Sequence, residues 1–284
     1  MCGAGGLPAR MAEEARRRGW RVLAFAFADA VVPHAERIVP ARLDELALVL
    51  ATLQTERIGA VLFSGRFSMG EIVRTDAARA DAFSRSVGER AGSRIDAALA
   101  GTIITTLAGF GIEVLDQRPF FGDSLAAAGA FAKRTASEAE AADIRRGFAI
   151  ARTIADARIG QTVVVRHGAV TAVEAVEGTT EAIRRGTAHA GRGAVIVKAV
   201  ARDHDYRFDV PAVGLETVRT AIEGGAAVLA VEAGRVVILD RDEIARAADA
   251  AGLALIGIDA DVASTVAGGA DGGSGRRPEP PDSP

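Results

Sequence analysis

Helical and strand-like segments alternate along the first part of this 284-residue chain. The apolar pattern predicts helices and strands in turn at 9–18, 21–27, 43–56, 60–64, 95–110 and 112–115. Strands that are separated by helices in this way are typical of a parallel sheet with helices on its faces. We therefore expect an α/β protein with a parallel sheet in its N-terminal domain.

Short strands are more frequent in the second part, where we expect a mixed α/β domain. The predicted helices lie at 139–155, 215–223 and 241–251, and the predicted strands at 162–165, 171–174, 194–200, 227–232, 236–239 and 253–258. The sequence Arg166-His-Gly-Ala169 favours a hairpin turn. We divide the chain into domains at 1–124 and 125–264 and a tail at 265–284, whose polar, Gly- and Pro-rich composition predicts disorder.

Composition excludes several classes of protein. Net charge is −3, with 34 basic residues interleaved among 37 acidic ones, so no basic stripe indicates a nucleic-acid partner. Cys2 is the single cysteine, which excludes an internal disulfide and a thiolate zinc site. No leader pattern and no apolar run of about 18 residues is present, so any membrane contact is expected to be peripheral. These observations favour a cytoplasmic protein.

The chain begins with a glycine-rich segment that leads into the first predicted helix. Gly3, Gly5 and Gly6 precede Leu7 and Pro8, which is how a glycine loop directs backbone N–H groups and a helix N-terminus at a phosphate. A flexible lead is the alternative interpretation. No strand is predicted before the glycines, so the first strand of the sheet is expected to be missing or to precede the assigned start.

A second candidate loop, Ser64-Gly65-Arg66-Phe67-Ser68, follows a predicted strand at the edge where open α/β sheets bind ligands. An ordinary turn is the alternative. The four histidines lack the spacing of a metal triad, and His204 is of interest only because of its charged neighbours. Motifs for a nucleophilic serine, a complete phosphate loop and a Cys–His pair are absent, which disfavours nucleophilic triad chemistry.

Charged residues are concentrated between 171 and 214, in segments otherwise rich in Val and Ala. They are Glu174, Glu177, Lys198, Asp203, Asp205, Arg207 and Asp209. Charges so close to apolar strands need a partner or a ligand. If 205–209 is extended, Asp205, Arg207 and Asp209 project to one face. Carboxylates with a lysine and the Gly178 turn suit a phosphate, a metal ion or both, whereas a charged surface strand is the alternative.

The order of these motifs resembles the LpxI family of UDP-2,3-diacylglucosamine pyrophosphatases over nearly the whole chain. The residues that carry the resemblance are Gly3-Ala-Gly-Gly6-Leu7-Pro8, Asp143-Ile144, Gly160-Gln161-Thr-Val-Val-Val165, Ala172-Val-Glu-Ala-Val-Glu177-Gly178-Thr179, Lys198, Asp205-Tyr-Arg-Phe-Asp209-Val-Pro211 and Gly214. The resemblance implies a Rossmann-like N-terminal domain, a C-terminal α/β domain and a substrate between them. It also implies magnesium-dependent hydrolysis of UDP-2,3-diacylglucosamine to UMP and 2,3-diacylglucosamine 1-phosphate in lipid A synthesis.

The resemblance further implies roles for single residues. Asp209 matches the family's essential aspartate and is expected to organise a metal ion or the attacking water. The expected ligands of Mg²⁺ are Asp209, Asp205 and Glu177. The expected substrate-binding residues are Gly3, Gly5, Gly6, Leu7, Pro8, Gly65, Gly178, Thr179, Lys198 and Arg207. The expected partners are the UDP-linked diacyl sugar lipid, the inner membrane surface as a peripheral contact, and a second copy in a homodimer.

Several positions depart from the family pattern. Thr180 stands where an Asp usually follows Glu-Gly-Thr, and Ala201-Arg202 replaces a Lys-Pro pair. A diverged hydrolase acting on another nucleotide-linked sugar or lipid, and a non-catalytic binding protein, are therefore kept as alternatives. A nicotinamide oxidoreductase is a more distant one, because the glycines lack a convincing acidic ribose partner.

Overall fold

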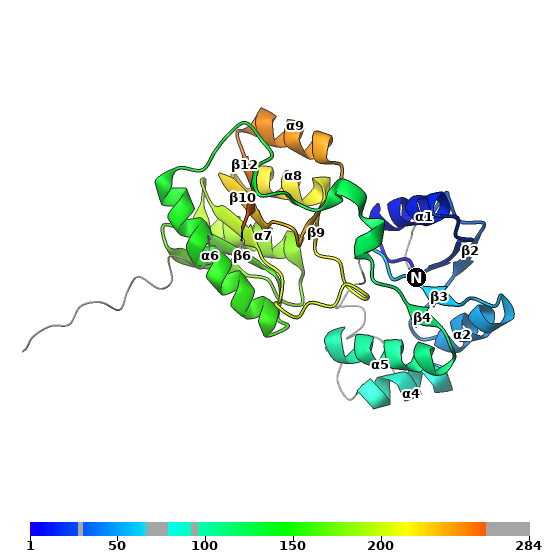
Figure 1. The fold of residues 1–284 in the computed structure, drawn as a ribbon. Coiled ribbons are helices and arrows are strands. Elements are labelled where there is room, and N and C mark those ends of the chain that lie inside the picture. Colours follow the sequence, from blue (N-terminus) through cyan, green and yellow to red (C-terminus); the bar gives the residue numbers. More distant parts are fainter. Residues whose placement is uncertain (28–30, 66, 68–78, 92–95, 260–284) are drawn as a thin grey trace, which may run out of the picture.

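A computed structural model of the chain describes residues 1–27, 31–65, 67, 79–91 and 96–259. Helices and strands gather into two lobes, an N-terminal lobe drawn from blue to cyan and a C-terminal lobe drawn from green to orange (Figure 1). Both lobes combine strands with covering helices, which confirms the α/β class. The predicted tail at 265–284 lies outside the described residues.

The N-terminal lobe contains parallel strands of two to four residues. The described residues of this lobe form two parallel pairs, β1 (Leu23–Ala26) with β2 (Arg37–Pro40) and β3 (Ala60–Val61) with β4 (Glu113–Val114). Residues 1–3 run between β1 and β3, with Cys2 bridged in parallel to both sides. Phe25 accepts a backbone hydrogen bond from Cys2, and Ser64 donates one to Met1, both at 2.8 Å. These bonds join the two pairs around the chain start.

Residues 1–3 therefore lie at the position of the first strand, which was expected to be missing or to precede the assigned start. They form isolated bridges and not a full strand. An extended segment nevertheless precedes the glycine loop, which is the arrangement that phosphate-binding loops require. The Met1 ammonium group donates to the Leu62 carbonyl at 2.9 Å, and burial lowers its pKa.

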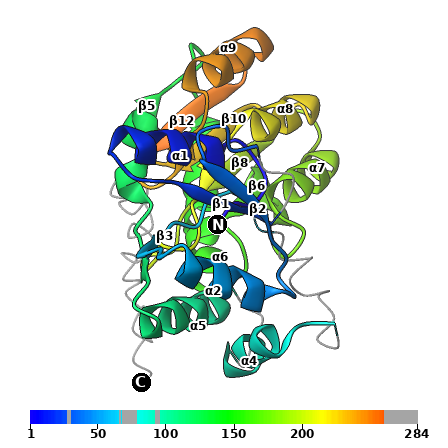
Figure 2. The same cartoon turned by 90° about the vertical axis from the view of Figure 1, so that its right-hand side faces the viewer.

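Helices cover both faces of the strands in this lobe. They are α1 (Leu7–Arg17), α2 (Leu46–Thr55), α4 (Ala82–Ala91) and α5 (Asp96–Gly109). Because side chains alternate along a strand, Val61 faces Leu53 of α2 and Leu107 of α5, whereas Leu62 faces Met11 of α1. Figure 2 shows α1 on one side of β1, with α2 and α5 on the other.

The C-terminal lobe is built on a sheet of six strands, as far as the described residues show. In spatial order they are β5 (Gly129–Ala130), β12 (Ala254–Ile258), β10 (Val228–Glu232), β8 (Val195–Lys198), β6 (Thr162–Arg166) and β7 (Ala169–Val173). The three central strands β12, β10 and β8 are parallel, and the β6–β7 hairpin and β5 are antiparallel to their neighbours. With its covering helices, this sheet confirms the expected mixed α/β domain.

Four helices sandwich this sheet within the described part of the chain. They are α6 (Glu138–Asp156), α7 (Thr179–Ala190), α8 (Leu215–Glu223) and α9 (Arg241–Ala251). Phe148 and Ile154 of α6 pack on one face, while Ile183 of α7 and Ile244 of α9 pack on the other. The central strands are buried on both faces, which explains why their sequences are continuously apolar.

The predicted hairpin turn is confirmed. His167 and Gly168 both have positive φ angles, 48° and 76°, as tight turns between antiparallel strands require. The buried Asp143 of α6 accepts hydrogen bonds from both of their backbone N–H groups, at 2.9 and 2.6 Å. A residue that carried the family resemblance thus fixes this turn.

Two elements near the site were not expected. Helix α7 follows Gly178, where only a turn was foreseen, and β9 (Ala212–Val213) pairs in parallel with β11 (Val237–Ile238). The segment at 205–209, in contrast, forms turns where an extended strand was expected. Within the described residues, no helix combines the length and apolar character needed to cross a bilayer.

Candidate functional site

Three side chains meet where strands β7 and β8 end and α7 begins. Glu174 follows β7, Lys198 ends β8, and the intervening β6 brings them into register through Thr162. Lys198 Nζ lies 3.2 Å from Thr179 Oγ1, which donates to Glu174 Oε1 at 2.8 Å. Glu174 and Lys198 are only 9% and 5% exposed. The sheet therefore holds a buried acid and a buried base around one hydroxyl group.

The electrostatics of this group favour the charged carboxylate. Burial by itself raises the pKa of Glu174, but Lys198, the Thr179 hydroxyl and the Gln161 backbone N–H stabilise the anion, and the pKa is lowered overall. Gln161 N donates to Glu174 Oε2 at 3.2 Å. Glu174 is consequently a fixed negative charge that holds Lys198 at the strand end.

The N-terminus of α7 adds a second positive element. Gly178 precedes the helix with φ of 84°, and no side chain caps its first N–H groups within the described residues. Unpaired N–H groups at a helix start attract anions. Gly178, Thr179 and Lys198, three of the predicted substrate-binding residues, are thus brought together in a form suited to a phosphate.

Asp209 lies on the loop between β8 and β9 and is connected to this group through one side chain. Its Oδ2 atom accepts from Gln161 Nε2 at 3.0 Å, and Gln161 is also the backbone donor to Glu174. His204 Nε2 is 3.8 Å from Asp209 Oδ2 and 3.1 Å from its carbonyl oxygen. The Asp209 side chain is 52% exposed, so it can contact a bound substrate.

The expectation that Asp205, Arg207 and Asp209 share one face is wrong. Asp205 accepts from the backbone N–H of Arg207 at 2.9 Å and binds its guanidinium group at 2.7 Å. This local hydrogen bond bends the chain into a turn, because an Asp side chain competes with extended backbone for nearby N–H donors. Arg207 holds the pKa of Asp205 below its usual range. Asp205 and Arg207 therefore form an ion pair with each other.

The three predicted metal ligands occupy different environments. Glu177 pairs with Arg185 of α7, Asp205 pairs with Arg207, and Asp209 contacts Gln161. The described residues contain no group of three or more His, Cys, Asp or Glu side chains that could hold a metal ion. The side chains alone thus do not form a magnesium cage, and Asp209 is the carboxylate of the three that is not engaged with an arginine.

The chain start lies beside Ser64 and Gly65 of the second candidate loop, whose Arg66 and Ser68 are outside the described residues. Gly3 N donates to Ser64 O at 2.8 Å, and a Cβ atom on Gly65 would lie 2.8 Å from the Gly3 carbonyl oxygen. Gly5 has φ of 99° and Gly6 precedes α1, whereas Leu7 and Pro8 are buried in the first turn of that helix. The close approach of two backbones explains a glycine at position 65.

Aromatic contacts connect the two lobes beside Asp209. The Phe208 ring lies 5.3 Å from that of Phe63, just after β3, and the Tyr206 ring lies 6.5 Å from that of Phe121. Gln117 N also donates to the Tyr206 carbonyl at 3.2 Å. The loop that carries Asp209 is therefore held against the N-terminal lobe, so the junction between the lobes is next to the candidate site.

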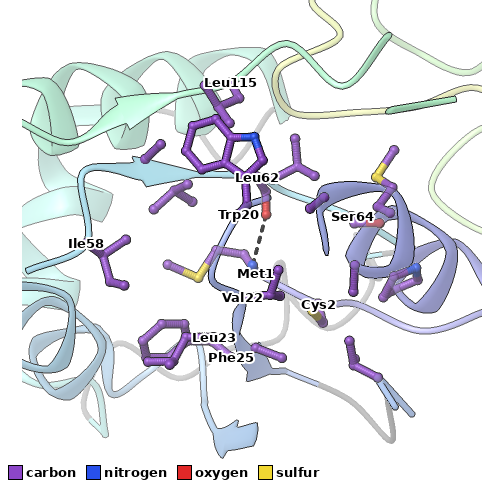
Figure 3. Close-up of a pocket in the computed structure, with 18 of the residues that line it drawn as sticks. Met1, Cys2, Trp20, Val22, Leu23, Phe25, Ile58, Leu62, Ser64 and Leu115 are labelled. Carbon is purple, nitrogen blue, oxygen red and sulfur yellow. Dashed lines mark hydrogen bonds between the residues drawn. The ribbon is translucent and has the colours of Figure 1, made fainter. Parts of the chain in front are cut away.

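A cavity of about 110 Å³ lies elsewhere, inside the N-terminal lobe between β1 and β3 (Figure 3). Met1, Trp20, Leu62 and Leu115 are among the residues around it, and they give it an apolar lining. Pro8 is the single predicted site residue that lines it. The cavity does not adjoin the Lys198 group, and an apolar lining is unsuited to a phosphate.

Three residues at the site had received no role from the sequence. Gln161 carried the family resemblance, Glu174 was part of the charged segment, and His204 was noted only for its neighbours. Glu174 and Lys198 each come at the end of a strongly apolar strand, and this position is the sequence signal that could have placed both of them at the site. No sequence signal pairs Gln161 with Asp209, because the contact depends on a loop that returns across the sheet.

Both lobes match models of known protein families. The family model of the LpxI N-terminal domain matches residues 1–124, and that of the LpxI C-terminal domain matches residues 127–256. A protein of Caulobacter vibrioides named UDP-2,3-diacylglucosamine pyrophosphatase LpxI is 31% identical over 276 residues. The match covers 91% of this chain and 96% of that protein.

Proposed function

Because the chain belongs to the LpxI family, we propose that it hydrolyses the pyrophosphate bond of UDP-2,3-diacylglucosamine. The products are 2,3-diacylglucosamine 1-phosphate and UMP, and the reaction belongs to lipid A biosynthesis. The proposal is supported by the relative of that name, which aligns along nearly its whole length. It is also supported by the site, where a buried lysine and a helix N-terminus are connected through Glu174 and Gln161 to an exposed aspartate.

The single observation that carries the proposal is the connection of Asp209 to Lys198 through Gln161, Glu174 and Thr179. Pyrophosphate hydrolysis needs positive groups that bind phosphoryl oxygens and a base that orients water. Lys198 and the N–H groups at the start of α7 supply the positive groups. The Asp209 carboxylate supplies the group that orients water.

In this proposal each residue has a limited task. Lys198 and α7 bind one phosphate, and the glycine loop at α1 is available for another part of the substrate. Gln161 holds Asp209 by a hydrogen bond to Oδ2, which leaves Oδ1 to organise either the metal ion or the attacking water. Glu174 holds Lys198 in place through the Thr179 hydroxyl. The attacked phosphorus receives a hydroxyl group, and UMP or the sugar phosphate leaves.

Magnesium is part of this proposal. Mg²⁺ commonly binds through one or two carboxylates together with substrate phosphates, so a complete protein cage is not required. Asp209 would hold the ion together with the pyrophosphate oxygens. When bound, the ion would neutralise charge on the phosphoryl group. A homodimer and contact with the inner membrane surface are further expectations, the second because the substrate carries two acyl chains.

The proposal is tested by UMP release from UDP-2,3-diacylglucosamine with and without Mg²⁺, using the wild type, Asp209→Asn and the control Asp203→Asn. Asp203 lies on the same loop, is 77% exposed and pairs with Arg158. Loss of a positioned proton acceptor typically lowers turnover by about 10²–10⁴-fold, so Asp209→Asn should do so while Asp203→Asn should not.

Stability must be measured alongside activity. Asp209 is half exposed, so its loss should change the free energy of unfolding by less than about 1 kcal/mol. Wild-type turnover in Asp209→Asn would refute the role of Asp209. A wild type that releases no UMP would refute the proposed reaction.

A diverged substrate is the second candidate. It is favoured by Arg202, which binds the Asp156 carboxylate with both its backbone N–H and its guanidinium group. Arg202 therefore does not replace the lost Lys-Pro pair as a cation at the site. Thr180 Oγ1 likewise lies 3.3 Å from Glu216. Faster turnover of another UDP-linked sugar or lipid than of the diacyl compound would support this alternative.

A further inference from the structure

Glu232 is a buried carboxylate at the end of β10, and no role has been given to it. The residue is 1% exposed. Arg152 of α6 and Arg235 both contact Oε1, the second at 3.5 Å, and Arg152 also lies over the Phe148 ring at 5.3 Å. One buried anion is therefore surrounded by two cations on the side of the sheet where the strands β8 and β10 end.

The contacts of Glu232 lead directly to the loop that carries Asp209. Oε2 accepts from the backbone N–H of Val200 at 2.8 Å, two residues after Lys198. Arg235 Nη2 donates to the Ala201 carbonyl at 2.6 Å. The Arg235 carbonyl accepts in turn from the Tyr206 hydroxyl at 2.9 Å. The ionic side chains thus bind the loop at its start, and the Arg235 backbone binds it near its middle.

Burying this ionic group is unfavourable in free energy, because a carboxylate and two guanidinium groups lose bound water when the protein folds. Apolar side chains of similar size would fill this space without that loss. The ionic group differs from them in fixing the directions of the bonds to Val200 and Ala201. The need to fix the loop at Val200 and Ala201 therefore explains why charged side chains are buried here.

We propose that Glu232 is a positioning residue: with Arg235 it fixes the loop from Val200 to Tyr206, and so sets where Asp209 stands relative to Lys198. The proposal rests on the proposed function for its kinetic part only. Tyr206 is the single tyrosine of the chain, and it packs on His204 with ring centroids 4.8 Å apart. It therefore reports on the loop without any reaction being measured.

The test compares Glu232→Gln with Glu140→Gln. Glu140 also pairs with an arginine in the C-terminal lobe, Arg134, and its side chain is 12% exposed, but its contacts lie at the start of α6. Glutamine at 232 retains an acceptor for Val200 N and loses the charge. We expect kcat to fall at least tenfold in Glu232→Gln with KM changed less than threefold, and both constants to remain unchanged in Glu140→Gln.

The second readout is ¹⁹F NMR of protein labelled with 3-fluorotyrosine, which gives one resonance from Tyr206. The resonance should shift or broaden in Glu232→Gln and stay unchanged in Glu140→Gln. If Glu232→Gln does not fold, Arg235→Lys serves in its place, because it keeps the charge and removes the forked bonds from a side chain that is 25% exposed.

An unchanged resonance together with wild-type kcat would overturn the proposal. So would a loss of kcat of the same size in Glu140→Gln, because a general loss of stability would then explain the effect. If the wild type releases no UMP, the proposed reaction fails, and the fluorine resonance alone decides whether Glu232 positions the loop.

Discussion

Removal of the Glu174 carboxylate should destabilise the protein strongly, because it would leave Lys198 buried without its counter-ion. Both residues are less than 10% exposed. In Glu174→Ala the Lys198 ammonium group keeps its contact with Thr179 but loses the nearby negative charge. The hydrogen bonds that Glu174 accepts from Thr179 and from Gln161 N are lost as well.

The magnitude follows from the burial of the pair. The two charges are linked through the Thr179 hydroxyl and not by a direct ion pair. Removing one of two buried opposite charges costs up to about 3–5 kcal/mol of unfolding free energy, since the remaining charge is desolvated and has lost its counter-charge. Glu177→Ala is the matched control. Glu177 follows on the same segment but pairs with Arg185, whose side chain is 46% exposed, and such exposed pairs contribute about 0–1 kcal/mol.

The pH dependence gives the sign of the effect. The pKa of Glu174 is lowered in the folded protein from its ordinary value of 4.5. The carboxylate therefore stabilises the fold above pH 4.5, and this contribution is lost as pH falls through the lower folded-state pKa. The difference in stability between wild type and Glu174→Gln should be largest near neutral pH and should shrink below pH 4.5.

Urea unfolding followed by circular dichroism measures these quantities at a series of pH values. The double variant Glu174→Gln/Lys198→Met should be more stable than Glu174→Ala, because neither charge is then buried alone. The reasoning is refuted if Glu174→Ala costs no more than Glu177→Ala. It is also refuted if the cost is the same at pH 4 and pH 7.

Two further predictions concern packing and hydrogen bonding. A Cβ atom at Gly160 would lie 2.3 Å from the Glu174 carbonyl oxygen, so Gly160→Ala should lower the free energy of unfolding by about 1–3 kcal/mol. Gly88 in α4 is the control, because a Cβ atom there would meet no neighbouring atom within 4 Å. Gly88→Ala should therefore raise the free energy of unfolding by about 0.5–1 kcal/mol. Asp143→Ala should cost about 1–3 kcal/mol, because the N–H groups at 167–168 lose their acceptor. Urea midpoints test both, and unchanged midpoints would contradict them.

Much of the fold could be predicted because it is local. The strands β6, β8, β10 and β12 are short apolar runs between turns, and their helices have one apolar face. Helix α7 was not predicted, since the polar Thr179-Thr-Glu start and Gly186 weaken its helical pattern. Gly186 is needed there because a Cβ atom would lie 2.5 Å from the Val164 side chain, a contact that only the packed helix reveals.

The sequence by itself determined the chemistry available to this protein: a glycine loop before a helix, a Gly-Thr turn, a lysine after an apolar strand and a segment rich in aspartate. These are properties of neighbouring residues. The tertiary structure decided which of them meet. Strand order places β6 between β7 and β8 and so joins Glu174 to Lys198, whereas the turn at Asp205 separates it from Asp209. Side-chain partners across a sheet depend on strand order and loop path, which residue spacing does not encode.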